Sequence, residues 1–244
     1  MSDTSGNLIR LRENLQQVQQ RMASACLRGE RDASTVRLVA VTKSVDMPVI
    51  QDLIQCGQCV LGENRPQQLI QRAAILESLT SHPETALQWH LIGQLQSNKI
   101  RSVLPRAAMI HSIDSVTLLN RISRIAKELG LVPRLLLQVN ISGETSKSGF
   151  TPNALRDAWE EIQQIEHVEL AGFMTMAPLT DEEQSIRQTF RGLRELRDEL
   201  QCRADRIILK ELSMGMSHDF EIAIEEGATL VRVGTSLFEG CEPS

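Results

Sequence analysis

The sequence predicts an α/β protein: a closed (β/α)8 barrel of the TIM-barrel class, with one extra helix before the first strand. Eight short apolar runs alternate with segments of helical periodicity, and no linker rich in Pro, Gly or Ser divides them. The 244 residues also suit this class, since such barrels often use about 250 residues as one domain. We therefore expect one domain over residues 1–244, with the helix at about 6–29 and the barrel at about 36–238.

The extra helix is predicted by apolar residues that recur at alternating steps of three and four, the spacing of one helical face. These residues are Leu8, Leu11, Leu15, Val18 and Met22. Gly29 follows them and offers a C-terminal stop. The segment is therefore expected to form an amphipathic helix.

The first strand is expected at Leu38–Val41, a continuous apolar run with β-branched residues that is typical of a strand buried on both faces. The other seven strands are expected at Cys59–Gly62, Leu87–Gly93, Met109–Ile113, Leu135–Asn140, Val168–Thr175, Ile207–Ser213 and Thr229–Gly234. An open doubly wound sheet is the alternative. It is weaker, because Lys43-Ser44-Val45 follows the first strand where a dinucleotide-binding loop needs glycines.

Three of the intervening helices carry recognisable start signals. Asp114 or Ser115 precedes a helical period that ends at Gly130. Thr151-Pro152 starts a second helix, with Pro where it removes no hydrogen bond. The acids of Asp181-Glu182-Glu183 suit the N-terminus of a third, because a helix dipole is positive there.

Composition excludes several classes of function. Lys plus Arg number 26 and Asp plus Glu number 31, and the net charge of −5 is not gathered into a basic patch, so we expect no nucleic-acid partner. No apolar run reaches the roughly 20 residues of a membrane span, and residues 1–10 do not resemble a signal peptide, so we expect a cytoplasmic protein without membrane contact. The five cysteines are an odd number and predict free thiols, and the lone C-x-x-C at Cys56 and Cys59 predicts no metal site.

Function in such a barrel lies at the carboxyl ends of the strands. The residues that end the apolar runs are Lys43, Glu63, Asn64, His90, Ser112, Asp114, Asn140, Met174, Thr175, Ser213, Gly234 and Thr235. Strand alternation places Val39, Val41 and Lys43 on one face. A lysine held in a partly apolar pocket has an amine free to attack a carbonyl, whereas the alternative is a surface ion pair.

The last two strands end in loops that suit an anion. Ser213-Met214-Gly215-Met216-Ser217 and Gly234-Thr235 supply glycines, whose backbone N–H groups can approach phosphate oxygens, and hydroxyl donors. Arg232 lies within the last strand on the inward face and needs a partner, either a buried carboxylate or a heterocyclic nitrogen. A lysine, a phosphate cradle and an arginine at one barrel mouth match the aldehyde, phosphate and pyridine nitrogen of pyridoxal 5′-phosphate (PLP).

The chain also resembles the YggS/PROSC family of PLP homeostasis proteins, which are single-domain barrels similar to the N-terminal domain of alanine racemase. The resemblance spans residues 37–238. It rests on Val41-Thr42-Lys43, Gly62-Glu63-Asn64, Trp89-His90-Leu91-Ile92-Gly93-Gln94-Leu95-Gln96-Ser97-Asn98-Lys99, Asn140-Ile141-Ser142, Ser146-Lys147-Ser148-Gly149, Gly172-Phe173-Met174-Thr175-Met176, Ser213-Met214-Gly215-Met216-Ser217-His218-Asp219 and Val231-Arg232-Val233-Gly234-Thr235. So many blocks in the right order make the resemblance highly specific.

The resemblance implies a fold-type III PLP barrel in which Lys43 carries the cofactor as an internal aldimine. It implies that Ser213, Gly234 and Thr235 hold the phosphate and that Arg232 faces the pyridine nitrogen. It further implies a pocket lined by Asn64, His90, Met174 and Met214.

A carrier is expected rather than an enzyme, so no residue is assigned a catalytic role. Alanine racemases use a lysine and a tyrosine on opposite faces of the cofactor, and this chain has no tyrosine. An arginine beside the pyridine nitrogen also disfavours its protonation, which weakens the ring as an electron sink. We expect a monomer that holds PLP and delivers it to PLP-requiring apoenzymes. The alternative is a low-activity PLP-dependent amino-acid racemase or lyase.

Overall fold

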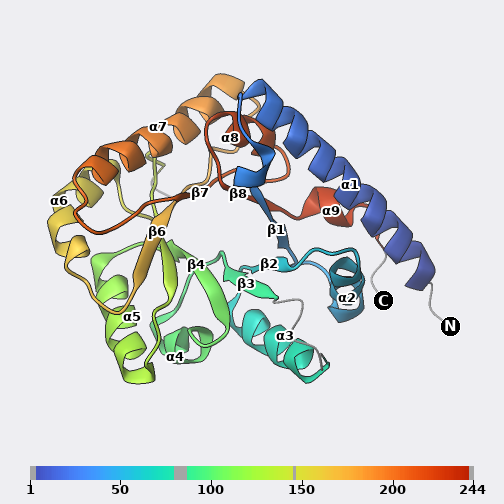
Figure 1. The fold of residues 1–244 in the computed structure, drawn as a ribbon, viewed down its shortest axis with the longest axis horizontal. Helices are drawn as coiled ribbons and strands as arrows, with labels where there is room; N and C mark the ends of the chain where they lie inside the picture. Colours follow the sequence, from blue (N-terminus) through green and yellow to red (C-terminus); the bar gives the residue numbers. More distant parts are fainter. Residues whose placement is uncertain (1–3, 80–86, 145–146, 242–244) are drawn as a thin grey trace.

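The barrel closes as the sequence predicts. The computed structural model describes residues 4–79, 87–144 and 147–241. The eight strands are parallel and follow one another around the barrel in chain order, with the eighth paired to the first (Figure 1). They are β1 Arg37–Val41, β2 Val60–Glu63, β3 Gln88–Leu91, β4 Ala107–Ile113, β5 Arg134–Gln138, β6 Glu169–Met174, β7 Glu211–Ser213 and β8 Leu230–Val233.

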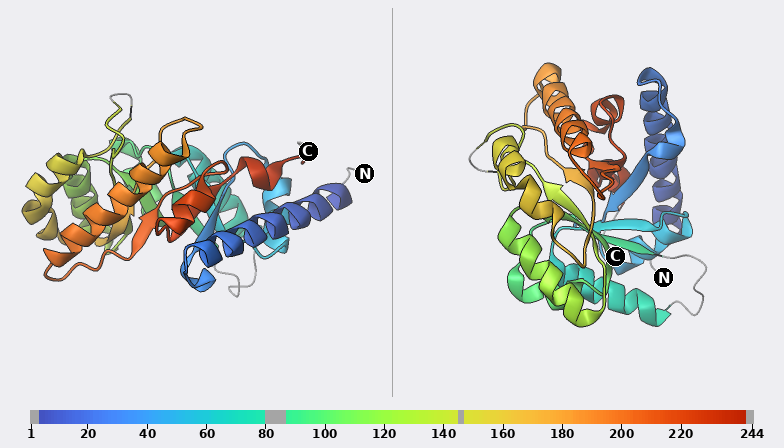
Figure 2. Two further views of the ribbon diagram at one scale, coloured as in Figure 1. Left: turned by 90° about the horizontal axis from the view of Figure 1, so that it is seen from above. Right: turned by 60° about the vertical axis from the view of Figure 1, so that its left-hand side comes forward.

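The helices form an outer layer around the strands (Figures 1 and 2). They are α1 Thr4–Arg28, α2 Met47–Gln55, α3 Pro66–Leu79, α4 Ile100–Val103, α5 Val116–Leu129, α6 Pro152–Gln163, α7 Glu183–Cys202, α8 Phe220–Glu225 and α9 Thr235–Phe238, with short 3-10 turns at Ala33–Thr35 and Ser97–Lys99. The predicted start signals operate: Ser115 Oγ accepts from Leu118 N and Thr151 Oγ1 accepts from Ala154 N. Gly130 ends α5 in the left-handed conformation, as a helix stop does.

The seventh strand is shorter than the sequence predicts. Pairing begins only at Glu211, and the predicted residues before it, 207–210, are irregular. The side chain of Gln201 on α7 takes up backbone groups that a strand would use, since it donates to Ile207 O at 2.9 Å and accepts from Leu209 N at 2.6 Å. This local satisfaction removes the need for a ladder partner.

Apolar packing is divided between two clusters. The larger lies between the barrel and the helices. The smaller fills the barrel interior with Val39, Met109, Leu136, Ala171, Met174 and Leu230. The barrel is therefore a packed core rather than a pore, and in this class of barrel the functional site lies at the carboxyl ends of the strands.

The helix α1 fastens the two helices that follow the last strands. It lies along α8 and α9 (Figures 1 and 2), and Asn14 Nδ2 donates to Leu237 O at 3.0 Å at the end of α9. Arg21 pairs with Glu221 on α8 and stacks over the Phe220 ring at 4.6 Å. No helix in the described ranges is long and apolar enough to cross a membrane.

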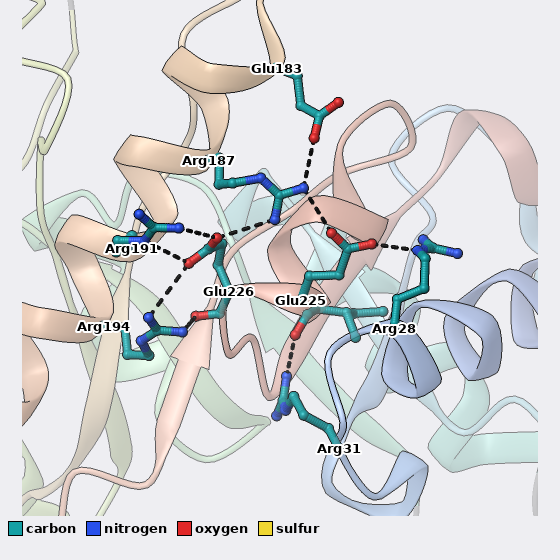
Figure 3. A network of polar contacts seen from close by, with 9 residues as sticks. Arg28, Arg31, Glu183, Arg187, Arg191, Arg194, Glu225 and Glu226 are labelled. Atoms are coloured by element: carbon teal, nitrogen blue, oxygen red, sulfur yellow. Dashed lines mark hydrogen bonds and ion pairs between the residues drawn. The ribbon is translucent and has the colours of Figure 1, made fainter.

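A network of ion pairs locks α8 between α1 and α7 (Figure 3). Glu225 pairs with Arg28 and Arg187, and Glu226 pairs with arginines 187, 191 and 194. Burial opposes ionisation of Glu226, yet the hydrogen bonds from Arg191 and Arg187 outweigh it and hold the pKa of this carboxyl below its usual value. The network fixes the helix that follows the loop after β7.

Candidate functional site at the barrel mouth

Lys43 lies at the mouth, immediately beyond the carboxyl end of β1. The strand ends at Val41, and the chain then turns, with Val45 N donating to Thr42 O at 3.2 Å. Strand alternation therefore does not extend to Lys43, and its side chain is exposed rather than held in an apolar pocket as expected. Within the described part of the chain no hydrogen bond or ion pair engages its amine, so the alternative of a surface ion pair is not realised there.

The two loops after β7 and β8 lie together, as the anion-site hypothesis requires. Gly234 N donates to Ser217 Oγ at 3.3 Å, and Arg232 N donates to Gly215 O at 2.9 Å. Gly215 has a φ of +91°, and a Cβ there would lie 2.6 Å from that of Ala223. Only glycine permits this loop to pass so close to α8.

Ser213 and Thr235 differ in accessibility. Ser213 ends β7 and is completely buried, whereas Thr235 begins α9 and is exposed. Gly234 between β8 and α9 is half-buried. Thr235 is therefore more accessible to a ligand than Ser213.

Arg232 points into the barrel and is 4% exposed. Its Nη1 donates to Ser213 Oγ at 2.6 Å and its Nη2 donates to Thr175 O at 3.0 Å. Among the described residues no carboxylate lies within ion-pair distance of this guanidinium, so the first of the two expected partners is absent there. Burial lowers the pKa of Arg232 to about 10, against an opposing contribution from the charge of Asp219.

Two histidines continue this chain of hydrogen bonds inward. His111 Nδ1 lies 2.8 Å from Ser213 Oγ, and its Nε2 lies 2.9 Å from His90 Nδ1. Burial lowers the pKa of His90 to about 3. Burial, joined by repulsion from His90 when both rings are protonated and from Arg232, holds the pKa of His111 well below its usual value. Both imidazoles are therefore neutral at pH 7.

His111 was missed by the sequence analysis, which took the end of its strand at Ser112 and Asp114. One signal points to it: His111 stands two residues after Met109 in the predicted strand, and residues two apart share a face. Since Met109 lies inside the barrel, a polar residue at 111 does too.

The neutral histidines predict acid sensitivity. Because their folded pKa values lie below the unfolded value of about 6.5, their contribution to stability is complete above pH 6.5 and is lost as the pH falls toward 3. Each histidine adds a slope of up to ~1.4 kcal/mol per pH unit. We expect the free energy of unfolding, measured in urea at pH 7, 6 and 5, to fall accordingly. His111→Gln should flatten that slope, and an unchanged slope would contradict the assignment.

The remaining predicted pocket residues lie in three different surroundings. Asn64 follows β2 and is half-buried, and a Cβ on Gly93 would lie 2.0 Å from its carbonyl oxygen. Met174 belongs to the interior cluster, while Met214 belongs to the outer cluster against the helices. The side chain of Met174 thus lies beneath the mouth, and that of Met214 points away from it.

Lys147 joins two loops of the mouth. Its Nζ donates to Glu144 Oε1 at 2.6 Å and to Ala177 O at 2.9 Å, which ties the loop after β5 to the loop after β6. Asn140 closes the first of these loops by donating to Glu144 O at 2.8 Å. Ser146, part of the same family block, lies outside the described residues. The amine of Lys147 is therefore engaged where that of Lys43 is not.

Comparison with known proteins places the chain among relatives of the same size. The family model described as alanine racemase, N-terminal domain, matches residues 7–242. A protein of Aquifex aeolicus named pyridoxal phosphate homeostasis protein is 41% identical over 226 residues, which are 93% of this chain and 96% of that protein. A protein of Pseudomonas aeruginosa with the same name is 38% identical over 227 residues, or 93% and 94% of the two chains.

Solved structures agree with this grouping. PipY of Synechococcus elongatus, solved with PLP bound, is 40% identical with a TM-score of 0.79 over 91% of this chain and 99% of PipY. An alanine racemase of Clostridium difficile is 18% identical, with a TM-score of 0.73 over 96% of this chain and 57% of that one. The latter likeness concerns the fold alone, and it confirms the predicted racemase-like barrel.

Proposed function

The chain belongs to the alanine racemase N-terminal domain family and, within it, to the PLP homeostasis proteins, and from this premise we propose that it binds PLP at the barrel mouth and holds it without robust catalysis. One observation carries the proposal. The carboxyl-terminal end of the barrel carries the exposed lysine after β1, the two joined glycine and hydroxyl loops, and a buried guanidinium that has no carboxylate partner among the described residues. The relatives named above are PLP homeostasis proteins, and PipY was solved with PLP.

The residues present fit this cofactor in chemistry. PLP supplies an aldehyde that condenses with an amine, and the exposed Nζ of Lys43 is such an amine. Its phosphate needs N–H and hydroxyl donors. The exposed Thr235 is accessible to a ligand, and we assign it to the phosphate together with Gly234 and Ser213, whose N–H and hydroxyl are bonded to Ser217 and Arg232 in the structure and would exchange these partners for the phosphate. Its pyridine nitrogen is an acceptor, and Arg232 is the buried donor beside the same loops.

The other assigned residues support these contacts. Asn64 borders the mouth after β2, and Met174 closes the floor beneath it. His90 acts through His111, which fixes the position of the Ser213 hydroxyl. Met214 offers its backbone to a ligand, because its side chain packs into the outer cluster.

Two observations favour holding over turnover. Arg232 keeps a guanidinium, not a carboxylate, beside the assigned position of the ring nitrogen, so the nitrogen stays unprotonated. Proton removal from both faces of an amino acid needs two bases, and the 244 residues contain no tyrosine to act opposite Lys43. We propose that the protein stores PLP in the cytoplasm as a monomer and releases it to apoenzymes.

We expect the purified wild-type protein to absorb light at the violet edge of the visible spectrum after addition of PLP. We also expect it to bind PLP at least about tenfold more tightly than pyridoxal. Loss of the phosphate removes charge-assisted hydrogen bonds that contribute roughly 1.5–3 kcal/mol each. Titration followed by absorbance gives both affinities. Equal affinities would show that the two loops do not hold a phosphate.

The same preparation separates a carrier from an enzyme. With PLP bound, interconversion of D- and L-alanine and of D- and L-serine should stay far below the usual enzymatic range of roughly 1–10³ per second. Turnover within that range would replace the carrier by the racemase. A protein that binds neither PLP nor pyridoxal would overturn the proposed function altogether.

A further inference from the structure

One arginine holds the backbone of the turn that carries Lys43 by hydrogen bonds. Arg72 on α3 donates through Nη1 to Thr42 O at 2.8 Å and through Nη2 to Val45 O. These carbonyls stand on either side of Lys43, one residue before it and two after it. A planar guanidinium reaches both at once, because its donors form a rigid fork.

Arg72 is itself fixed by a buried carboxylate. Glu63, at the end of β2, is completely buried and forms an ion pair with Arg72, whose side chain is only 13% exposed. The Oγ1 of Thr42 donates to the same carboxylate oxygen at 2.5 Å. The other oxygen of Glu63 has no hydrogen-bond partner in the described ranges, so its charge is balanced through Arg72.

The buried ion pair is better explained as a constraint on conformation than as a source of stability. A buried ion pair contributes little net stability compared with apolar residues of the same size, whereas it restricts the conformations available to its surroundings. Here the restricted element is the backbone on both sides of an exposed lysine whose side chain makes no hydrogen bond or ion pair with the described residues.

We propose that Arg72, held by Glu63, is a positioning residue that fixes Lys43 for covalent capture of the PLP aldehyde. In that step Nζ of Lys43 adds to the aldehyde carbon, and the aldehyde oxygen leaves as water with the two protons of the amine. The inference rests on the proposed function and adds to it the device that sets the reach and direction of the amine. The hydrogen bonds of Arg72 to the described residues go to Thr42, Val45 and Glu63, none of which belongs to the loops after β7 and β8.

Two ligands separate positioning of the amine from general support. PLP carries an aldehyde, whereas pyridoxine 5′-phosphate carries an alcohol in its place and forms no bond to a lysine. Both present the same phosphate and ring nitrogen to the mouth. A residue that acts through Lys43 changes the affinity for the first ligand and leaves the second unchanged.

The test uses Arg72→Lys in the full-length protein, because an ammonium keeps the charge beside Glu63 but cannot donate to two carbonyls in the fixed fork. Affinities for both ligands and the rate of the absorbance change with PLP are measured. We expect the affinity for PLP to fall about tenfold, a factor that corresponds to the free energy of roughly one hydrogen bond. The affinity for pyridoxine 5′-phosphate should stay within about threefold of that of the wild type. Borohydride reduction and peptide mapping check that the new lysine has not itself captured the aldehyde.

A matched control and a second variant keep the result interpretable. Arg31→Lys also perturbs a guanidinium that holds two backbone carbonyls, since Arg31 Nη1 donates to Ile224 O and to Ala228 O at 2.7 Å, between α1 and α8 rather than at the Lys43 turn. This variant should change the affinities for both ligands by the same factor. The pair Glu63→Gln with Arg72→Met removes both buried charges together and repeats the test if the single variant does not fold.

Three outcomes decide the inference. A selective loss of PLP affinity in the Arg72 variants supports it. Equal losses for both ligands, or none for either, in a folded protein would reduce Arg72 to a structural support. If the wild type binds pyridoxine 5′-phosphate but attaches PLP to another lysine, the role of Arg72 fails while PLP binding stands; if it binds neither ligand, the proposed function fails first.

Discussion

Replacing Lys43 with alanine should abolish covalent attachment of PLP and leave the barrel as stable as before. The amine is exposed and has no described partner, so its removal should change the free energy of unfolding by less than ~0.5 kcal/mol. The visible absorbance with PLP should disappear, while pyridoxine 5′-phosphate should still bind through the phosphate loops. Borohydride reduction of the wild-type complex, followed by peptide mapping, should find the pyridoxyl group on Lys43.

Two other lysines provide the comparison. Lys127→Ala, on the exposed surface of α5, should behave as wild type. Lys147 is engaged by Glu144 and Ala177, so its amine is not available for the aldehyde. A pyridoxyl group found mainly on Lys147 or Lys99 would show that the assignment of Lys43 is incorrect.

Arg232→Met should separate binding from stability. The variant should lose on the order of 10–100-fold in PLP affinity, since a charge-assisted hydrogen bond to a buried acceptor contributes roughly 1.5–3 kcal/mol. The free energy of unfolding of the apo protein should change by under ~2 kcal/mol, because the two contributions to it oppose each other. Burial lowers the pKa of Arg232 to about 10, so the charged form is held in the fold at a penalty on the order of 2–4 kcal/mol, which the loss of two hydrogen bonds roughly offsets.

Calorimetric titration and urea unfolding of the apo protein measure the two effects. Thr175→Val is a suitable companion, because the Thr175 hydroxyl donates to Val139 O and the contact with Arg232 uses only its backbone carbonyl. It should lower stability without a matching loss of affinity. If the Arg232→Met protein binds PLP as tightly as the wild type does, the assignment of Arg232 to the pyridine nitrogen is wrong.

The fold could be predicted from the sequence because the signals that specify its strands and helices are local. Apolar runs, helix caps and stop glycines act within a few residues, and Leu38–Val41, Ser115 and Gly130 all occupy the elements predicted for them. The paired loops after β7 and β8 were predictable for a related reason: in a parallel barrel, loops after neighbouring strands must lie side by side.

The exposure of Lys43 was not predictable in the same way. Alternation holds only while the chain remains a strand, and β1 stops at Val41 because the next residues turn onto Arg72. The extended prediction for β7 failed through a similar local competitor, the side chain of Gln201.

The sequence by itself determined the barrel, the lysine just beyond the end of β1 and the glycine and hydroxyl residues of the last two loops, for which anion binding stays a prediction. Only the tertiary structure decided what surrounds them. The chain from His90 through His111 and Ser213 to Arg232 joins four strands, and closure of the barrel brings together residues that lie 21, 102 and 19 positions apart. Arg72 donates its hydrogen bonds in the Lys43 turn to backbone carbonyls. Every residue has such a carbonyl, so no pattern of side chains in the sequence predicts these bonds.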